Sequence, residues 1–182
     1  MRQGIIIFGA NGSGKTTLGK ELAQILGFKH MDIEDYYFEK SEIPYTIAHS
    51  REECVGLMLS DIEKYHSFVL TAVTGDFGDI IPTFYKFAVL ITAPLEIRLE
   101  RIKHRAFEKH GERVCEGGDM YEANKKFIDF VSSRSLTNID RFAQTLTCPV
   151  MQIDGTIDRR INTENIAKFY RETVLHSECI DF

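Results

Sequence analysis

Short apolar runs alternate with amphipathic stretches along most of the chain. The first run, residues 5–8, is wholly apolar and ends at Gly9, a pattern that predicts a parallel strand buried on both faces. Over residues 15–26 the apolar positions recur at helical spacing, and Gly27 predicts the end of that helix. Similar short apolar runs predict four more strands, at residues 28–31, 68–73, 87–92 and 150–153.

Helix signals occupy the intervals between these runs. Ser50, with Glu53 three residues later, has the spacing of a capping box and predicts a helix that ends near residue 66. Pro94 opens a long charged helix that continues to about residue 109, and a polar segment with glycines follows it. Two more helices are predicted, over residues 119–146 and 162–174.

This alternation of strands and helices, without a hairpin signal, predicts an α/β fold with three layers around a parallel sheet. Nothing in the sequence resembles a repeat or a linker, so we expect residues 1–182 to form one domain. Within it we expect a substrate-binding segment at about residues 33–66 and a helical lid at about residues 106–135.

The composition is that of an ordinary globular protein. Apolar residues make up 43% of the 182 residues and charged residues 27%, and the net charge is −5. Because binding to a phosphate backbone needs a surplus of lysine and arginine, we do not expect nucleic acid as a partner. The four cysteines are scattered, which argues against a disulfide framework or a zinc site. No signal peptide or membrane-length apolar stretch is evident, so we expect a cytoplasmic protein, monomeric or weakly dimeric, with no membrane partner.

The most specific motif is Gly-Ala-Asn-Gly-Ser-Gly-Lys-Thr at residues 9–16, which matches G-x-x-x-x-G-K-[ST] at every fixed position. Glycines let backbone N–H groups surround phosphate oxygens, and the following helix adds the positive end of its dipole. We expect Lys15 to contact the β- and γ-phosphates and the Thr16 hydroxyl to bind Mg²⁺. The predicted nucleotide-binding residues here are Gly9, Asn11, Gly12, Ser13, Gly14, Lys15, Thr16 and Thr17.

An acidic pair follows the second predicted strand. Asp32 closes the strand and Glu34 lies two residues on, so both side chains point toward one cleft if the chain remains extended. The carboxyl ends of parallel strands face the ligand crevice in such folds. We expect Asp32 to hold Mg²⁺ through water, and Glu34 or Asp35 to accept a proton from an acceptor hydroxyl. The alternative is a helix N-terminus with favourable acids in its first turn.

The sequence lacks the motifs of two other classes of nucleotide-binding protein. A GTPase needs N-K-x-D to recognise its base, and the nearest string, Asn-Lys-Lys-Phe at residues 124–127, does not match. A motor ATPase normally has acidic residues at the end of its third strand, whereas no acid appears here until Asp76.

The loop at residues 9–16, the Asp32-x-Glu34 pair, Gly75 after the third strand and an arginine-bearing lid together resemble the small P-loop kinases. This group includes adenylate, shikimate and gluconate kinases and chloramphenicol phosphotransferase. The resemblance implies a P-loop NTPase fold with a five-stranded parallel sheet of order 2-3-1-4-5, a mobile lid, and ATP with Mg²⁺ as cofactors.

The chain departs from two members of this group. Nucleoside monophosphate kinases usually carry a Thr-Gly-Asp-like segment and an arginine after strand two, where this chain has an acidic run. Shikimate kinases carry Asp-x-Asp there and a run of glycines after strand three, where only Gly75 and Gly78 are present. The acidic pair therefore favours a hydroxyl acceptor over a phosphate acceptor.

Arginines cluster in the lid region. Phosphoryl transfer needs positive charge around the transferring group, and the resemblance implies that Arg105, Arg113 and Arg134 close over ATP. Arg98 and Arg101 share a helix face with Arg105, at spacing i, i+3 and i+7. Because glutamates interleave with these two, we expect a solvated, ion-paired face for them.

Three weaker features complete the predicted site. Arg51 is placed to hold an anionic group on the acceptor, or is an exposed helical arginine. Gly75 and Asp76, in the loop after strand three, are predicted to contact the acceptor. Asp154 and Gly155 follow strand five, where the resembling kinases wrap backbone around adenine, although a simple turn explains Asp-Gly equally well.

The sequence thus predicts an ATP-dependent kinase that transfers a γ-phosphoryl group to a small-molecule acceptor, more readily a hydroxyl. Lys15, Asp32, Glu34, Arg113 and Arg134 are the predicted catalytic residues. The alternative within the enzyme class is a nucleoside monophosphate kinase. The alternative from another class is an ATP-binding switch, or an ATPase, without a small-molecule acceptor.

Overall fold

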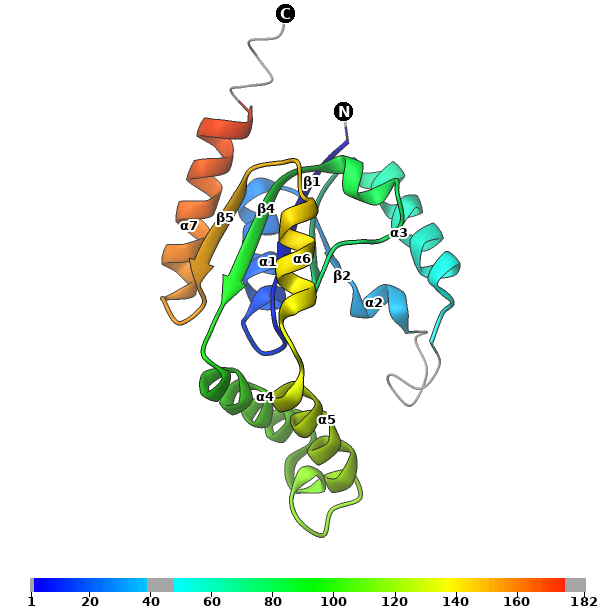
Figure 1. Ribbon diagram of the computed structural model, residues 1–182, viewed down its shortest axis with the longest axis vertical. Helices are drawn as coiled ribbons and strands as arrows, with labels where there is room; N and C mark the ends of the chain where they lie inside the picture. The colour runs from blue at the N-terminus through cyan, green and yellow to red at the C-terminus, as the bar shows by residue number, and fades with distance from the viewer. Residues whose placement is uncertain (1, 39–47, 176–182) are drawn as a thin grey trace, which may run out of the picture.

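Five parallel strands form the centre of the molecule in the order β2-β3-β1-β4-β5 (Figure 1). The computed structural model describes residues 2–38 and 48–175. The strands are β1 Gln3–Phe8, β2 Lys29–Asp32, β3 Ser67–Ala72, β4 Tyr85–Thr92 and β5 Val150–Asp154. The predicted sheet order is confirmed.

Burial of strand β1 on both faces of the sheet explains why its sequence is apolar at successive positions. Side chains alternate across a strand, so Ile5 and Ile7 face one side of the sheet and Ile6 and Phe8 the other. All four have no exposed surface. Helices α1 (Lys15–Leu26) and α7 (Arg159–Phe169) cover the first side, and α3 (Arg51–Tyr65) and α6 (Thr137–Thr145) cover the second. Phe8 packs edge-on against Phe142 of α6, with ring centroids 5.0 Å apart.

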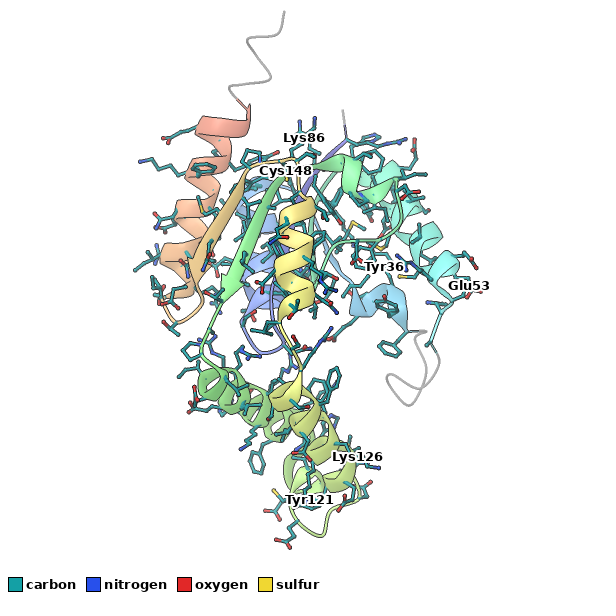
Figure 2. All side chains as sticks on the ribbon, in the orientation of Figure 1. Tyr36, Glu53, Lys86, Tyr121, Lys126 and Cys148 are labelled. Carbon is teal, nitrogen blue, oxygen red and sulfur yellow. The ribbon has the colours of Figure 1, made fainter. Side chains whose placement is uncertain are left out.

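The region predicted to form a lid, about residues 106–135, extends beyond the carboxyl ends of the strands (Figure 1). It contains the end of α4 (Leu95–His110), the 3₁₀ turn η2 (Gly111–Val114) and α5 (Tyr121–Ser133). Tyr121 and Lys126, labelled in Figure 2, lie on α5 far from the sheet. The chain returns through α6, which packs on the sheet again.

The prediction of one helix over residues 119–146 is wrong, because two helices occupy this region. Helix α5 ends at Ser133, and Arg134 is extended with φ −66° and ψ 122°. Helix α6 begins at Thr137, whose N–H donates to the Ser135 hydroxyl at 3.2 Å. The break turns the chain from the lid back to the sheet, a change of direction that a continuous helix cannot make.

Strand β2 leads into the short helix α2 (Glu34–Tyr37) and then toward α3. Tyr36 anchors α2, because it is buried and its hydroxyl donates to the Asp61 carboxylate of α3 at 2.6 Å (Figure 2). The predicted capping box at Ser50 and Glu53 is confirmed. Residues 39–47 of the predicted substrate-binding segment lie outside the described residues.

Two shorter elements lie in the described part of the chain: the 3₁₀ turn η1 (Ile81–Phe84) before β4 and a π-helical turn (Tyr170–Leu175) after α7. Helix α7 begins at Arg159, three residues earlier than predicted. It begins there because the Asp158 side chain caps it by accepting from two backbone N–H groups. Over residues 2–38 and 48–175, no helix is both long and apolar enough to span a bilayer.

Replacing the cap of α3 tests how local signals contribute to this fold. We expect Ser50→Ala to lower the free energy of unfolding by about 1 kcal/mol, since the Glu53 N–H loses its acceptor. Ser132→Ala is the matched control, because Ser132 only donates to a carbonyl of its own helix. Urea unfolding of both variants measures the difference. Equal effects of the two changes would contradict the role given to the cap.

Candidate functional site

The loop between β1 and α1 has the backbone that its glycines allow. Gly9, Gly12 and Gly14 have φ values of 145°, 80° and 107°, which side chains rarely tolerate. At Gly12 a Cβ atom would lie 2.5 Å from the Arg98 carbonyl oxygen, so the loop packs directly on the backbone of α4. Glycine is required here by both conformation and space.

The N-terminus of α1 has no side-chain cap and no acidic residue in its first turn. The first N–H groups of a helix have no partner within the helix, and they favour an anion. Beside them, the fully buried Ser13 hydroxyl has no hydrogen-bond partner among the described residues. Both features fit a loop built to surround an oxygen-rich anion.

Lys15 opens α1 and lies within the curve of this loop. Its Nζ donates to the Ala10 carbonyl at 2.8 Å. Burial lowers the pKa of Lys15 to about 8, although the carboxylates of Asp32 and Glu34 act in the opposite direction. Desolvation thus disfavours the charged form of the Lys15 ammonium even though two carboxylates are near it. A bound anion would stabilise the charged form.

The acidic pair lies across from Lys15 at the end of β2. Asp32 and Glu34 both line the same cavity. The chain does not remain extended here: α2 begins at Glu34 with Glu34 and Asp35 in its first turn, the alternative that the sequence left open, and the Glu34 N–H donates to Asp32 Oδ1 at 3.2 Å. Partial burial raises the pKa of Glu34, and the charge of Asp32 raises it further.

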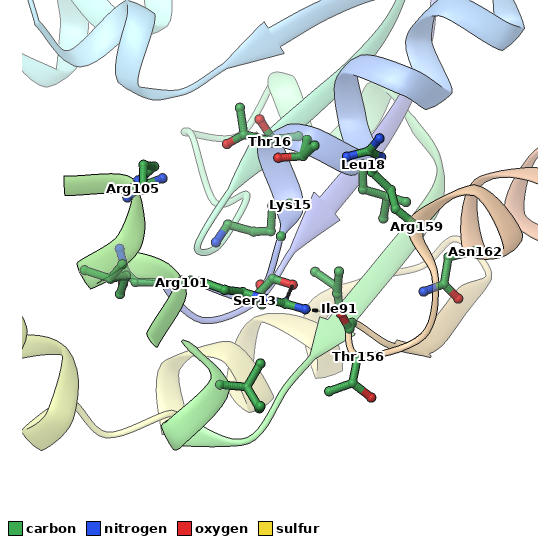
Figure 3. Close-up of a pocket in the computed structure, with 18 of the residues that line it drawn as sticks. Ser13, Lys15, Thr16, Leu18, Ile91, Arg101, Arg105, Thr156, Arg159 and Asn162 are labelled. Atoms are coloured by element: carbon green, nitrogen blue, oxygen red, sulfur yellow. Dashed lines mark hydrogen bonds between the residues drawn. The ribbon is translucent and has the colours of Figure 1, made fainter. Parts of the chain in front are cut away.

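The cavity that these groups share has a volume of about 800 Å³. Its walls come from the glycine loop, the end of β2, the inner face of α4 and the loop between β5 and α7. Figure 3 shows Lys15 at its centre, with Arg101 and Arg105 on one side and Arg159 and Asn162 on the other. The predicted residues that line it are Asn11, Gly12, Ser13, Gly14, Lys15, Thr16, Thr17, Asp32, Glu34, Arg105 and Gly155.

Arg98 corrects the expectation of a solvated, ion-paired helix face, whereas Arg101 is exposed as expected but bonds to backbone carbonyls. Arg98 is buried, and it donates from Nε to the Ala93 carbonyl and from Nη1 to the Asn11 carbonyl. Arg101 donates to the carbonyls of Ser13 and Gly155. The i, i+3, i+7 spacing of Arg98, Arg101 and Arg105 indicated that the three share one face of the helix. The interleaved glutamates favoured ion pairs in solvent instead, so the contacts with backbone carbonyls were not predicted.

The other lid arginines lie in different places. Arg105 lines the cavity, and Arg134, at the break between α5 and α6, donates to Asn11 Oδ1 at 3.2 Å. Arg113 lies in the outer part of the lid, where its guanidinium makes two hydrogen bonds to the Asp119 carboxylate. The structure does not bring Arg113 to the cavity.

The predicted acceptor residues after β3 lie apart from the cavity lining. Gly75 accepts the Tyr85 hydroxyl through its carbonyl at 2.9 Å, within the packed side of the sheet. Arg51 donates to the Asp76 carbonyl at 3.0 Å, so these two predicted residues meet each other. Asp76 itself accepts the Thr74 hydroxyl.

After β5, the two residues predicted to surround adenine differ. Gly155 lines the cavity beside the glycine loop, since a Cβ there would lie 2.6 Å from the Ser13 carbonyl oxygen. The Asp154 carboxylate instead accepts the Thr156 N–H and hydroxyl in a local turn. Arg159 and Asn162 also line the cavity and were not predicted, because their distance from the loop depends on the crossover from β5 to α7.

A family model described as "AAA domain" matches residues 5–122. The chain belongs to this family. The uncharacterized protein YqaC of Bacillus subtilis (strain 168), a similar protein, is 30% identical over 177 residues, covering 89% of this chain and 95% of YqaC.

Two further matches are to kinases. Shikimate kinase 2 of Yersinia pestis (strain Pestoides F) is 36% identical over 74 residues, which cover 41% of this chain and 40% of that enzyme. The crystal structure of a gluconokinase from Sinorhizobium meliloti 1021 matches with a TM-score of 0.58 at 11% identity, covering 100% of both chains. This AAA-domain family member therefore has a P-loop kinase fold, as the sequence resemblance predicted, and the fold implies nucleotide binding.

The lowered pKa of Lys15 predicts how phosphate binding depends on pH. Below a pH of about 8 the ammonium is charged in the free protein, so the affinity for ADP should be constant there. Above it, binding requires uptake of a proton, and the affinity should fall by up to about tenfold per pH unit. Calorimetric titration of ADP between pH 7 and 9.5 measures this.

Two variants separate this titration from other groups. Lys15→Met should bind ADP weakly and lose the decline above pH 8, whereas Lys168→Met, on the exposed face of α7, should retain both affinity and decline. A decline that persists in Lys15→Met would show that another group titrates.

Proposed function

We propose that this protein is an ATP-dependent kinase that transfers the γ-phosphoryl group to a hydroxyl of a small molecule. The observation that carries the proposal is the placement of Asp32 and Glu34 on the same cavity as Lys15 and the glycine loop. A loop for phosphates and a carboxylate able to accept a proton are the two parts that such a transfer requires.

The nucleotide end is formed by the glycine loop and its neighbours. The uncapped N-terminus of α1 and the Lys15 ammonium would hold the phosphates, and Gly155 would lie beside the base. Arg105 would add positive charge near the γ-phosphate from α4, which supports charge stabilisation during transfer. Arg134 is close enough to join it, because it already contacts Asn11.

The oxygen donors near Lys15 fit Mg²⁺. Mg²⁺ binds few protein ligands and keeps several waters, so Thr16 and Asp32, which both line the cavity, are a sufficient set beside phosphate oxygens. When bound, the ion would neutralise charge on the phosphates.

Glu34 is the proposed general base. Burial, and to a smaller extent the charge of Asp32, raises its pKa above the ordinary value, which makes the carboxylate a stronger base. The acceptor oxygen would form a bond to the γ-phosphorus as the bond to the β-phosphate oxygen breaks. The hydroxyl proton would pass to Glu34, and ADP would leave.

The charge of this end of the cavity favours a hydroxyl over a phosphate acceptor. Two carboxylates would repel an anionic acceptor group, and Arg51 is engaged by the Asp76 carbonyl. The local likeness to a shikimate kinase agrees with a hydroxyl acceptor. We further propose that the partner is a small molecule and that the protein acts as a monomer or a weak homodimer.

A screen for acceptor-dependent ADP release tests the proposal. The panel contains shikimate-like polyols, sugar acids, aminoglycoside-type alcohols, nucleosides and nucleoside monophosphates. We expect an alcohol to stimulate ADP release above the rate with ATP alone. Stimulation by nucleoside monophosphates only would identify a nucleotide kinase, and no stimulation by any compound would contradict the proposed transfer.

Once an acceptor is known, Glu34→Gln tests the base. We expect kcat to fall roughly a hundredfold or more, with little change in the Kd for ATP, because only proton transfer is lost. Glu164→Gln, on the exposed surface of α7, is the matched control and should behave as the original chain does. A Glu34→Gln enzyme with unchanged kcat would exclude Glu34 as the base.

A further inference from the structure

We propose that Arg98 is a positioning residue that turns the N–H group of Gly12 toward the bound phosphates. The inference rests on the proposed function, because it concerns how the same loop is held. It assigns a role to a buried arginine that does not line the cavity.

The contacts of Arg98 are directed and specific. The residue lies in the first turn of α4, and only 6% of its surface is exposed. Nε donates to the Ala93 carbonyl at 3.2 Å, and Nη1 donates to the Asn11 carbonyl at 3.3 Å. The first bond fixes the plane of the guanidinium against the segment just before α4, and the second directs it at the glycine loop.

The geometry of the peptide unit transmits this contact to Gly12. A peptide bond is planar, and in the trans form the C=O of one residue points opposite to the N–H of the next. None of the described peptide bonds is cis. A guanidinium that holds the Asn11 carbonyl toward α4 therefore holds the Gly12 N–H toward the other side of the loop, where an anion would lie.

The space around Gly12 reinforces this orientation. The residue has φ of 80°, and a Cβ atom would lie 2.5 Å from the Arg98 carbonyl oxygen. The backbone of α4 thus contacts the loop at the same peptide that the Arg98 side chain holds. Glycine can rotate this peptide at little cost, so an external hydrogen bond is needed to keep one orientation.

The next turn of α4 repeats the arrangement at a separate peptide. Arg101 Nη1 donates to the Ser13 carbonyl at 3.2 Å, which by the same geometry orients the N–H of Gly14. Arg101 also lines the cavity, so its loss would remove direct contacts as well. Arg98 is therefore the cleaner residue for a test, and Gly14 serves as an internal reference.

Amide spectra of the ¹⁵N-labelled chain test the inference, with tripolyphosphate as the probe. In the original chain the amide protons of Gly12 and Gly14 should both shift downfield when tripolyphosphate binds. In Arg98→Met and Arg98→Lys the Gly12 shift should be largely lost and the Gly14 shift retained. Arg98→Lys keeps the buried charge and most of the aliphatic stem, so we expect it to fold even if Arg98→Met does not. Lysine lacks the rigid fork of donors that arginine has.

Affinities provide a second measurement on the same samples. We expect the Kd for tripolyphosphate to rise about tenfold in either variant, the effect of one directed hydrogen bond, while the Kd for adenosine stays unchanged. Arg160→Met is the control, since it removes the same charge from an exposed position that pairs with Glu164. It should change neither Kd.

The outcomes separate this inference from the proposed function. If folded Arg98 variants show the original Gly12 shift, or lose the Gly12 and Gly14 shifts together, the inference is overturned while nucleotide binding stands. Recovery of the Gly12 shift by lysine alone would also overturn it, because charge would then suffice. If the original chain binds neither tripolyphosphate nor ATP, the proposed function fails first.

Discussion

The unsatisfied backbone N–H groups at the start of α1 are the constraint on which the rest of the site depends. A helix N-terminus without a cap is costly unless an anion or solvent completes it, and here no side chain does so. The glycine loop brings these groups together by adopting positive φ at three positions. Strand β1, buried on both faces, holds the loop at the carboxyl edge of the sheet.

The charged groups around the loop follow from that arrangement. Lys15 is desolvated because it lies inside the curve of the backbone, and its lowered pKa is the consequence. Asp32 and Glu34 offset this cost from the end of β2, and they raise the electrostatic penalty for any anionic acceptor at the same time. Arg105 of α4 also lines the cavity, and in the proposed reaction it would supply positive charge to the phosphates. The acidic pair would face the acceptor in that reaction.

The sequence predicted the parts of the molecule that local chemistry determines. The apolar run of β1, the glycine loop and the Ser50 cap each have a pattern that needs no tertiary context, and all three were placed correctly. The break after Ser133 was missed because both halves have helical periodicity, and only the return of α6 to the sheet requires a turn. Arg98 was misjudged for a similar reason, since glutamates beside an arginine in sequence do not reveal which backbone lies above it. Roles that depend on neighbours brought together by the fold are not encoded in short windows.

The identity of the reaction product tests the central claim most directly. The chain is incubated with ATP, Mg²⁺ and the stimulating alcohol, and the phosphorus-containing products are identified by ³¹P nuclear magnetic resonance. Transfer to a hydroxyl predicts a phosphate monoester of that alcohol in the same amount as ADP. Inorganic phosphate as the sole product beside ADP, whatever alcohol is present, would contradict it.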